Sequence, residues 1–99
     1  MDQTLTLKLQ EFEKALVSLE EVTNQEKTKI IRDSVIKRFE YTFEIAWKTT
    51  KVLLEKKFGV QTFSPKDCFR ALRINQLISD ENTESLLKMA DDRNEVIHT

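Results

Sequence analysis

Apolar residues along the chain recur at intervals of three and four, which is the repeat of an α-helix that buries one face. The first stretch predicts a helix over residues 3–22, with an apolar stripe of Leu5, Leu9, Phe12, Leu16 and Leu19. A longer stretch predicts a helix over residues 28–57, with a stripe of Ile31, Val35, Phe39, Phe43, Ala46, Trp47, Thr50, Leu53 and Leu54. Polar residues 23–27 are expected to connect the two. We interpret the aromatic cluster of this segment as core rather than as a platform for stacked bases; its members are Phe39, Tyr41, Phe43 and Trp47.

Start and stop signals divide the second half of the chain into two more helices. Gly59 ends the long helix, and Ser64 followed by Pro65 predicts a third helix over residues 65–76. This helix is expected to bury Cys68, Phe69 and Leu72, with Leu77 as a further candidate. Ser79 or Asp80 begins a fourth helix that runs to the end of the chain, with apolar positions Leu86, Met89, Ala90, Val96 and Ile97. We therefore expect an all-α fold, an antiparallel up-and-down helical bundle of four helices with one long central helix.

Composition supports a helical fold and narrows the class of protein. The 99 residues include one Gly and one Pro, too few for the many tight turns of a sheet-rich fold. Hydrophobic residues make up 39% and charged residues 33%, which is typical of a globular domain. One Cys and one His exclude an intramolecular disulfide and a zinc site built from these ligands. We expect a single cytoplasmic domain over residues 1–99, without metal, cofactor or membrane span.

Charge is distributed unevenly, although the formal net charge is only -1. Residues 1–26 hold two lysines and six acids, for a net of -4. Residues 27–57 hold nine Lys or Arg and four acids, for a net of +5, and residues 58–99 hold five and seven, for a net of -2. The basic segment has two interpretations. It is a guide for a phosphate backbone, or, more commonly, a solvated face that pairs with acidic neighbours.

The last seven residues hold the candidate functional side chains. Arg93 falls within the apolar arc of the fourth helix, which spans roughly 120°. A guanidinium keeps its charge and is costly to bury without an acceptor, such as a carboxylate, a run of carbonyls or a phosphate. Asn94 and His98 are i, i+4 neighbours on the flank of that arc. Two interpretations stay open: a functional cluster of cation, amide and imidazole, or a packed arginine whose head reaches water beside a surface histidine.

Three segments of the chain resemble one protein family. They are DSVIKRFEYTFEIAWKTTKVLLE (residues 33–55), SPKDCFRAL (residues 64–72) and RNEVIHT (residues 93–99). Together they resemble the nucleotidyltransferase substrate-binding branch of the HEPN (higher eukaryotes and prokaryotes nucleotide-binding) superfamily. RFEYTFEIAWK is the segment typical of that branch, and RNEVIHT matches the superfamily motif of an arginine and a histidine separated by four to six residues. The resemblance covers nearly the whole chain.

The resemblance implies partners and a site. Members form homodimers and are usually encoded beside a minimal nucleotidyltransferase, with which they act. They were first described as the substrate-binding subunit of that enzyme. Related HEPN proteins are toxins that cut RNA without a metal, with the nucleotidyltransferase as antitoxin. In those toxins the motif residues of two protomers meet at the dimer interface. Carried over to this sequence, the implied catalytic residues are Arg93, Asn94 and His98.

The resemblance also implies a role for each of these residues. His98 would act as general acid or base while a ribose 2′-hydroxyl attacks the adjacent phosphate. Arg93 would stabilise charge on the phosphoryl oxygens, and Asn94 would orient the phosphate or support the helix locally. Members usually continue past the motif with another helix, so we expect this chain to be truncated at its C-terminus and to lack a fifth helix. The functions left open are a substrate- or nucleotide-binding partner, a toxin ribonuclease, and a non-catalytic helical dimerisation or interaction module.

Overall fold

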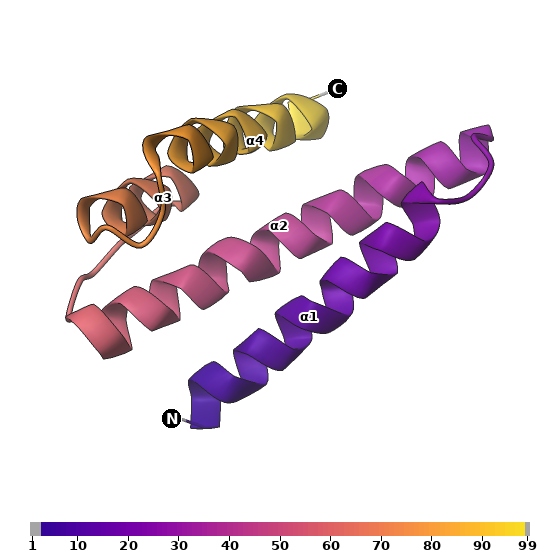
Figure 1. Cartoon of the computed structure of the whole chain (residues 1–99). Coiled ribbons are helices and arrows are strands. Elements are labelled where there is room, and N and C mark those ends of the chain that lie inside the picture. The colour runs from indigo at the N-terminus through magenta and orange to yellow at the C-terminus, as the bar shows by residue number, and fades with distance from the viewer. Residues whose placement is uncertain (1–2, 99) are drawn as a thin grey trace. The chain divides into compact units, whose positions relative to one another are not determined.

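The computed structural model describes residues 3–98, and side chains as far as residue 95. Within that range the chain forms four helices and no strand: α1 (Gln3–Thr23), α2 (Lys29–Phe58), α3 (Pro65–Ile74) and α4 (Asp80–His98) (Figure 1). The predicted all-α, bundle-like fold is confirmed, and α2 is the longest helix, as predicted. The chain divides into two compact units, Met1–Thr49 and Thr50–Thr99. The expectation of one domain over residues 1–99 stays a prediction.

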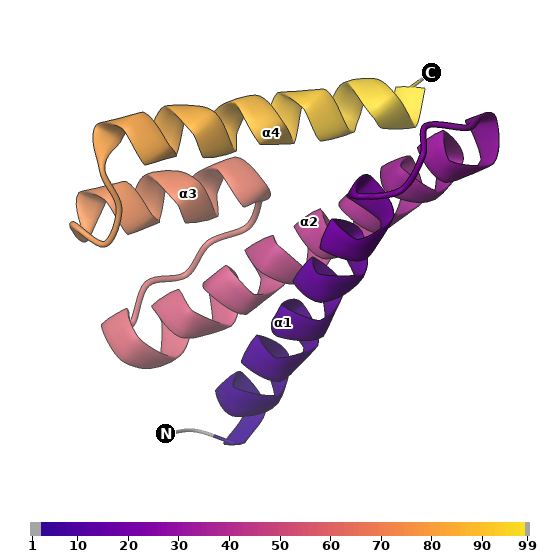
Figure 2. The ribbon, with the colours of Figure 1, turned by 45° about the vertical axis from the view of Figure 1, so that its right-hand side comes forward.

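In the first unit, α1 and the beginning of α2 run antiparallel (Figures 1 and 2). Side chains of α2 donate hydrogen bonds to main-chain carbonyls of α1: Arg38 Nη1 to Ser18 at 2.8 Å, Thr42 Oγ1 to Ala15 at 3.3 Å and Thr49 Oγ1 to Lys8 at 3.5 Å. Donors later in α2 bond to acceptors earlier in α1, as expected for two antiparallel helices. The buried hydroxyl groups of the two threonines are thereby satisfied.

The buried face of α1 is rotated from the face that the leucine spacing predicts. Leu5 is buried, and Phe12 and Leu19 are half-buried, as expected. Leu9 and Leu16, however, are 41% and 45% exposed. The stripe was thus predicted at the correct period but centred too far to one side.

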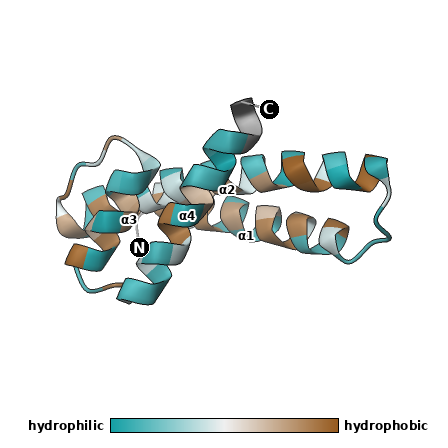
Figure 3. Cartoon of the chain, turned by 90° about the horizontal axis from the view of Figure 1, so that it is seen from above, coloured by the Kyte–Doolittle hydropathy of each residue, from teal (hydrophilic) through white to brown (hydrophobic). Residues whose placement is uncertain are grey.

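Small and β-branched residues occupy the other side of this face. Ala15 and Val22 are buried at 3% and 2% exposure. Because the distance between packed helices depends on the side chains at the contact, alanine lets the two backbones approach closely. That approach allows the short Thr42 side chain to reach a main-chain oxygen. Figure 3 shows the resulting pattern of apolar and polar residues around α1 and α2.

Both predicted helix starts in the second unit are confirmed. Ser64 has an extended backbone (φ -149°, ψ 161°), its Oγ accepts a hydrogen bond from Asp67 N at 3.2 Å, and Pro65 follows as the first helical residue. Ser79 Oγ accepts from Asn82 N at 3.1 Å, so serine is the cap of α4. Each cap satisfies a main-chain N–H that the first turn of a helix leaves without an intrahelical partner.

The α3 and α4 helices form an antiparallel hairpin (Figures 1 and 2). Its two ends are bridged by ion pairs, Lys66 with Asp91 at 2.5 Å and Arg73 with Asp80. Inside the second unit, Cys68 and Phe69 are buried as predicted. The core also includes Ala71, Thr83 and Ala90, whereas Leu72 is half-buried and Leu77 is 44% exposed.

The turn between α3 and α4 places Gln76 in the left-handed region, at φ 61°. Gln76 N donates to Arg73 O and Leu77 N donates to Leu72 O, which is the Schellman termination usually built with glycine. We expect Gln76→Gly to stabilise the protein by about 0.5–1 kcal/mol, because glycine adopts this conformation without a steric penalty. Urea unfolding measures the change. The matched variant Asn75→Gly should instead destabilise the protein, since it removes the 2.8 Å hydrogen bond from Asn75 Nδ2 to Ala71 O. Equal effects at the two positions would contradict this account of the turn.

The Cys68 thiol is buried, and its Sγ lies 2.9 Å from Thr62 Oγ1. Burial raises the pKa of Cys68 above the ordinary 9.0, and the charge of Asp67 acts in the same direction, while the Thr62 contact and Lys51 oppose it. The protonated thiol therefore stabilises the folded state fully below about pH 9 and progressively less as the pH rises above that value. Wild type and Cys68→Ala should differ less in unfolding free energy at pH 10 than at pH 7. A difference that grows with pH would contradict this prediction.

Candidate functional site

The candidate site lies on the last turns of α4. Arg93 is half-buried, as its place in the apolar arc predicts, and it takes part in an interaction with the rest of the structure. Ala90, about one turn earlier, is buried, while Met89 is 39% exposed. In the described part of α4 the buried side of the arc thus includes Ala90 and, in part, Arg93.

The two aspartates that precede Arg93 form ion pairs with lysines. Asp91 Oδ1 lies 2.5 Å from Lys66 Nζ, and Asp92 Oδ2 lies 3.9 Å from Lys88 Nζ. Such exposed pairs contribute about 0–1 kcal/mol to stability. Their more important effect is electrostatic, because a lysine beside each carboxylate reduces the repulsion that an approaching anion would meet at Arg93.

The three predicted site residues lie on one helix but do not share one face. Asn94 is exposed, and positions 94 and 98 are one turn apart on the same face of α4. Positions 93 and 98 are separated by about 140° around the helix axis. Positions 94 and 98 therefore share a face of α4 on which position 93 does not lie. The His98 side chain lies outside the described part of the chain, so its role stays a prediction.

Residues of the segment RFEYTFEIAWK stabilise the packing of α2 against α1 in the first unit. Arg38 bonds to α1, Phe43 is buried, and the Phe39 and Phe43 rings make a tilted contact at 6.1 Å. The predicted core role of this aromatic cluster agrees with that burial, except that Tyr41 is 62% exposed. The segment therefore identifies the helical hairpin rather than a set of reacting groups.

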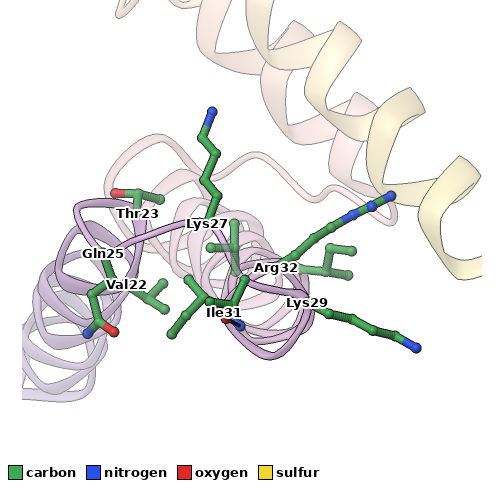
Figure 4. Close-up of a pocket in the computed structure, with 10 residues that line it drawn as sticks. Val22, Thr23, Gln25, Lys27, Lys29, Ile31 and Arg32 are labelled. Carbon is green, nitrogen blue, oxygen red and sulfur yellow. Dashed lines mark hydrogen bonds between the residues drawn. The ribbon is translucent and has the colours of Figure 1, made fainter.

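Sequence reasoning missed a pocket of about 830 Å³ at the α1–α2 turn. Figure 4 shows Val22 of α1 and Ile31 of α2 pointing toward one another, while Lys27, Lys29 and Arg32 extend outward. These residues were interpreted as a connection and the start of a helix. The change from acidic to basic composition at residue 27 indicates the cations around the pocket but not its apolar lining.

Among side chains within residues 3–95, His, Cys, Asp and Glu form no group of three or more that fits a metal ion. Of the helices within residues 3–98, none combines the length and apolarity needed to cross a membrane.

Comparisons with known proteins place this geometry in a family. The profile of the family described as "Nucleotidyltransferase substrate binding protein like" matches residues 7–99. The chain is also similar to a protein of Thermus thermophilus with a known crystal structure, at 42% identity and a TM-score of 0.83. That match covers 89% of this chain and 75% of the other. The search of curated proteins gave no match. The profile covers α4 and both helical hairpins, and the chain therefore belongs to the nucleotidyltransferase substrate binding protein-like family.

Proposed function

We propose that this protein is the substrate-binding HEPN partner of a minimal nucleotidyltransferase, and that it binds an RNA or nucleotide phosphate at Arg93, Asn94 and His98. The observation that carries the proposal is the half-buried Arg93, which begins the segment RNEVIHT that resembles the HEPN motif and lies within the residues that the family profile matches. A guanidinium at the edge of packed surface is oriented in advance and offers paired N–H donors to phosphate oxygens. Arg93 already takes part in an interaction within the protein, and the bound anion would either replace that interaction or form beside it.

The helix geometry favours a site made by two copies of the chain. Because positions 93 and 98 differ by about 140° around α4, a phosphate that meets both is most simply held between two α4 helices. A homodimer related by twofold symmetry would supply two arginines and two histidines to one cleft. Two nearby guanidinium groups repel each other, and a bound phosphate would relieve that repulsion.

A second function, metal-independent RNA cleavage, is favoured by the position of His98 one turn from Asn94. In this reaction a neutral imidazole removes the proton from a ribose 2′-hydroxyl, and the oxygen attacks the adjacent phosphorus. The bond from phosphorus to the 5′-oxygen breaks, and an imidazolium supplies a proton to that oxygen. The products are a 2′,3′-cyclic phosphate and a 5′-hydroxyl. Arg93 would stabilise the charge that develops on the phosphoryl oxygens.

Replacing His98 distinguishes the two functions. For a ribonuclease, His98→Ala should lower cleavage in EDTA by about 100-fold or more, while RNA binding falls by no more than about tenfold because Arg93 and Asn94 remain. Gel analysis of a 5′-labelled RNA and a parallel binding titration measure both quantities. If the wild-type protein binds RNA but leaves it intact, the binding function stands and the nuclease is excluded. If it neither binds nor cleaves RNA or nucleotides, the proposed function is wrong.

The partner is tested separately. Mixed with the minimal nucleotidyltransferase proposed as its partner, the protein should elute from a sizing column as one complex whose mass, by light scattering, contains both chains. Two separate peaks at concentrations of about 50 μM would argue against the partnership, since a functional complex is expected to have micromolar or tighter affinity.

A further inference from the structure

The pocket at the α1–α2 turn has an aliphatic floor. Val22, which closes α1 at this end, is 2% exposed. Ile31, Val35 and Ile36 follow along the first turns of α2, and all three are half-buried. Ile31 and Val35 are one turn apart and therefore line the same side of the helix. The floor matches aliphatic side chains, and no aromatic ring is among the described residues that line it.

The rim of this pocket is cationic. Lys27, Lys29 and Arg32 are exposed lining residues. In the part of the chain whose side chains are described, residues 3–95, none of these three cations takes part in an ion pair. The described lining residues include no acid, although Glu26 and Asp33 are close in the sequence. Three positive charges around an apolar floor complement an occupant that is both acidic and aliphatic.

We propose that this pocket is a docking site for an acidic amphipathic helix of a partner protein. Such a helix would place aliphatic side chains from positions i, i+3, i+4 and i+7 on the floor, and glutamates or aspartates on its flanks would face the three cations. Single-stranded RNA fits less well, because binding without sequence preference depends on aromatic side chains that stack with bases. The docking site lies in the first unit and does not depend on the proposed phosphate site of α4.

A designed peptide pair tests the proposal. The acidic peptide has Leu and Ile at i, i+3, i+4 and i+7 and Glu at the remaining positions, and the control peptide has Lys in place of every Glu. We expect the acidic peptide to bind and the basic one to bind at least about tenfold more weakly. Binding should perturb the amide NMR signals of residues 22–36. A third peptide, with Ser at the four apolar positions, should also lose about tenfold in affinity if the floor is used.

Charge reversal on one helix supplies a matched control in the protein. Lys29→Glu should weaken the acidic peptide about fivefold to tenfold, while Lys37→Glu, the same change at an exposed position outside the pocket, should change the affinity less than twofold. A glutamate at the first residue of α2 is compatible with the helix dipole, so Lys29→Glu should stay folded. The proposal is overturned by equal binding of both peptides, by perturbations outside residues 22–36, by displacement with polyuridylate RNA, or by self-association that Lys29→Glu abolishes.

Discussion

Arg93→Ala is expected to weaken binding of single-stranded RNA about 10-fold to 100-fold, the largest loss of function that we predict for a binding residue. The estimate follows from the roughly 1.5–3 kcal/mol that a hydrogen bond to a charged group contributes. Arg93→Lys should recover part of the affinity, because lysine keeps the charge but loses the paired geometry of the guanidinium. Fluorescence anisotropy with a labelled oligonucleotide at fixed salt measures these affinities.

A matched control is needed because Arg93 is half-buried and interacts with the rest of the structure. Arg70→Ala removes the same side chain from an exposed position of α3. It should change RNA affinity no more than about twofold. Thermal unfolding of both variants separates lost binding from lost folding. Equal losses in the two variants, or full affinity in Arg93→Ala, would show that general positive charge and not Arg93 binds the phosphate.

The second large effect is expected at Leu54. This side chain has 0% exposure, and truncating it to alanine should destabilise the protein by about 3 kcal/mol, within the 2–5 kcal/mol typical of a buried leucine. The adjacent Leu53 is only half-buried, so Leu53→Ala should cost roughly half as much or less. Urea unfolding of the two variants, read by circular dichroism, gives the comparison. Equal costs at the two positions would contradict the burial described for this end of α2.

These neighbouring leucines mark the limit of what the sequence predicts about the core. Both belong to the apolar stripe of the second helix, and a stripe defines a face to within roughly a third of a turn. Which residue is fully buried depends on the elements packed around the helix. The same limit applies to Leu9 and Leu16, which have the correct period but lie at the exposed edge of the α1 face, while Ala15 is at its centre.

Helix boundaries were predicted far better, because they depend on local chemistry. Ser64 and Ser79 cap helices through hydrogen bonds to residues three positions later, and Gly59 ends α2 with φ 66°. Such signals require no knowledge of tertiary packing. The predicted end of α3 was two residues too late, because Gln76 adopts a positive φ that is unusual for glutamine and so was not expected.

In the candidate site, too, local features were predictable and contacts between helices were not. The half-buried state of Arg93 was predictable, since it follows from the position of Arg93 in an apolar arc. The lysine partners of Asp91 and Asp92 were not predicted, and the Lys66 pair depends on how α3 packs against α4. The pocket at the α1–α2 turn was missed because its lining comes from two helices and the loop between them.

The most direct test of the phosphate site is an NMR titration of the protein, labelled with ¹⁵N and ¹³C, with a short single-stranded RNA. The proposed site predicts that the Arg93 Nε–H, the Asn94 side-chain amide and the His98 imidazole shift together, with one affinity, while the signals of residues 22–36 stay in place. Shifts at other residues without a shift at any of these three side chains would contradict the proposed phosphate site. So would the absence of any shift at millimolar RNA.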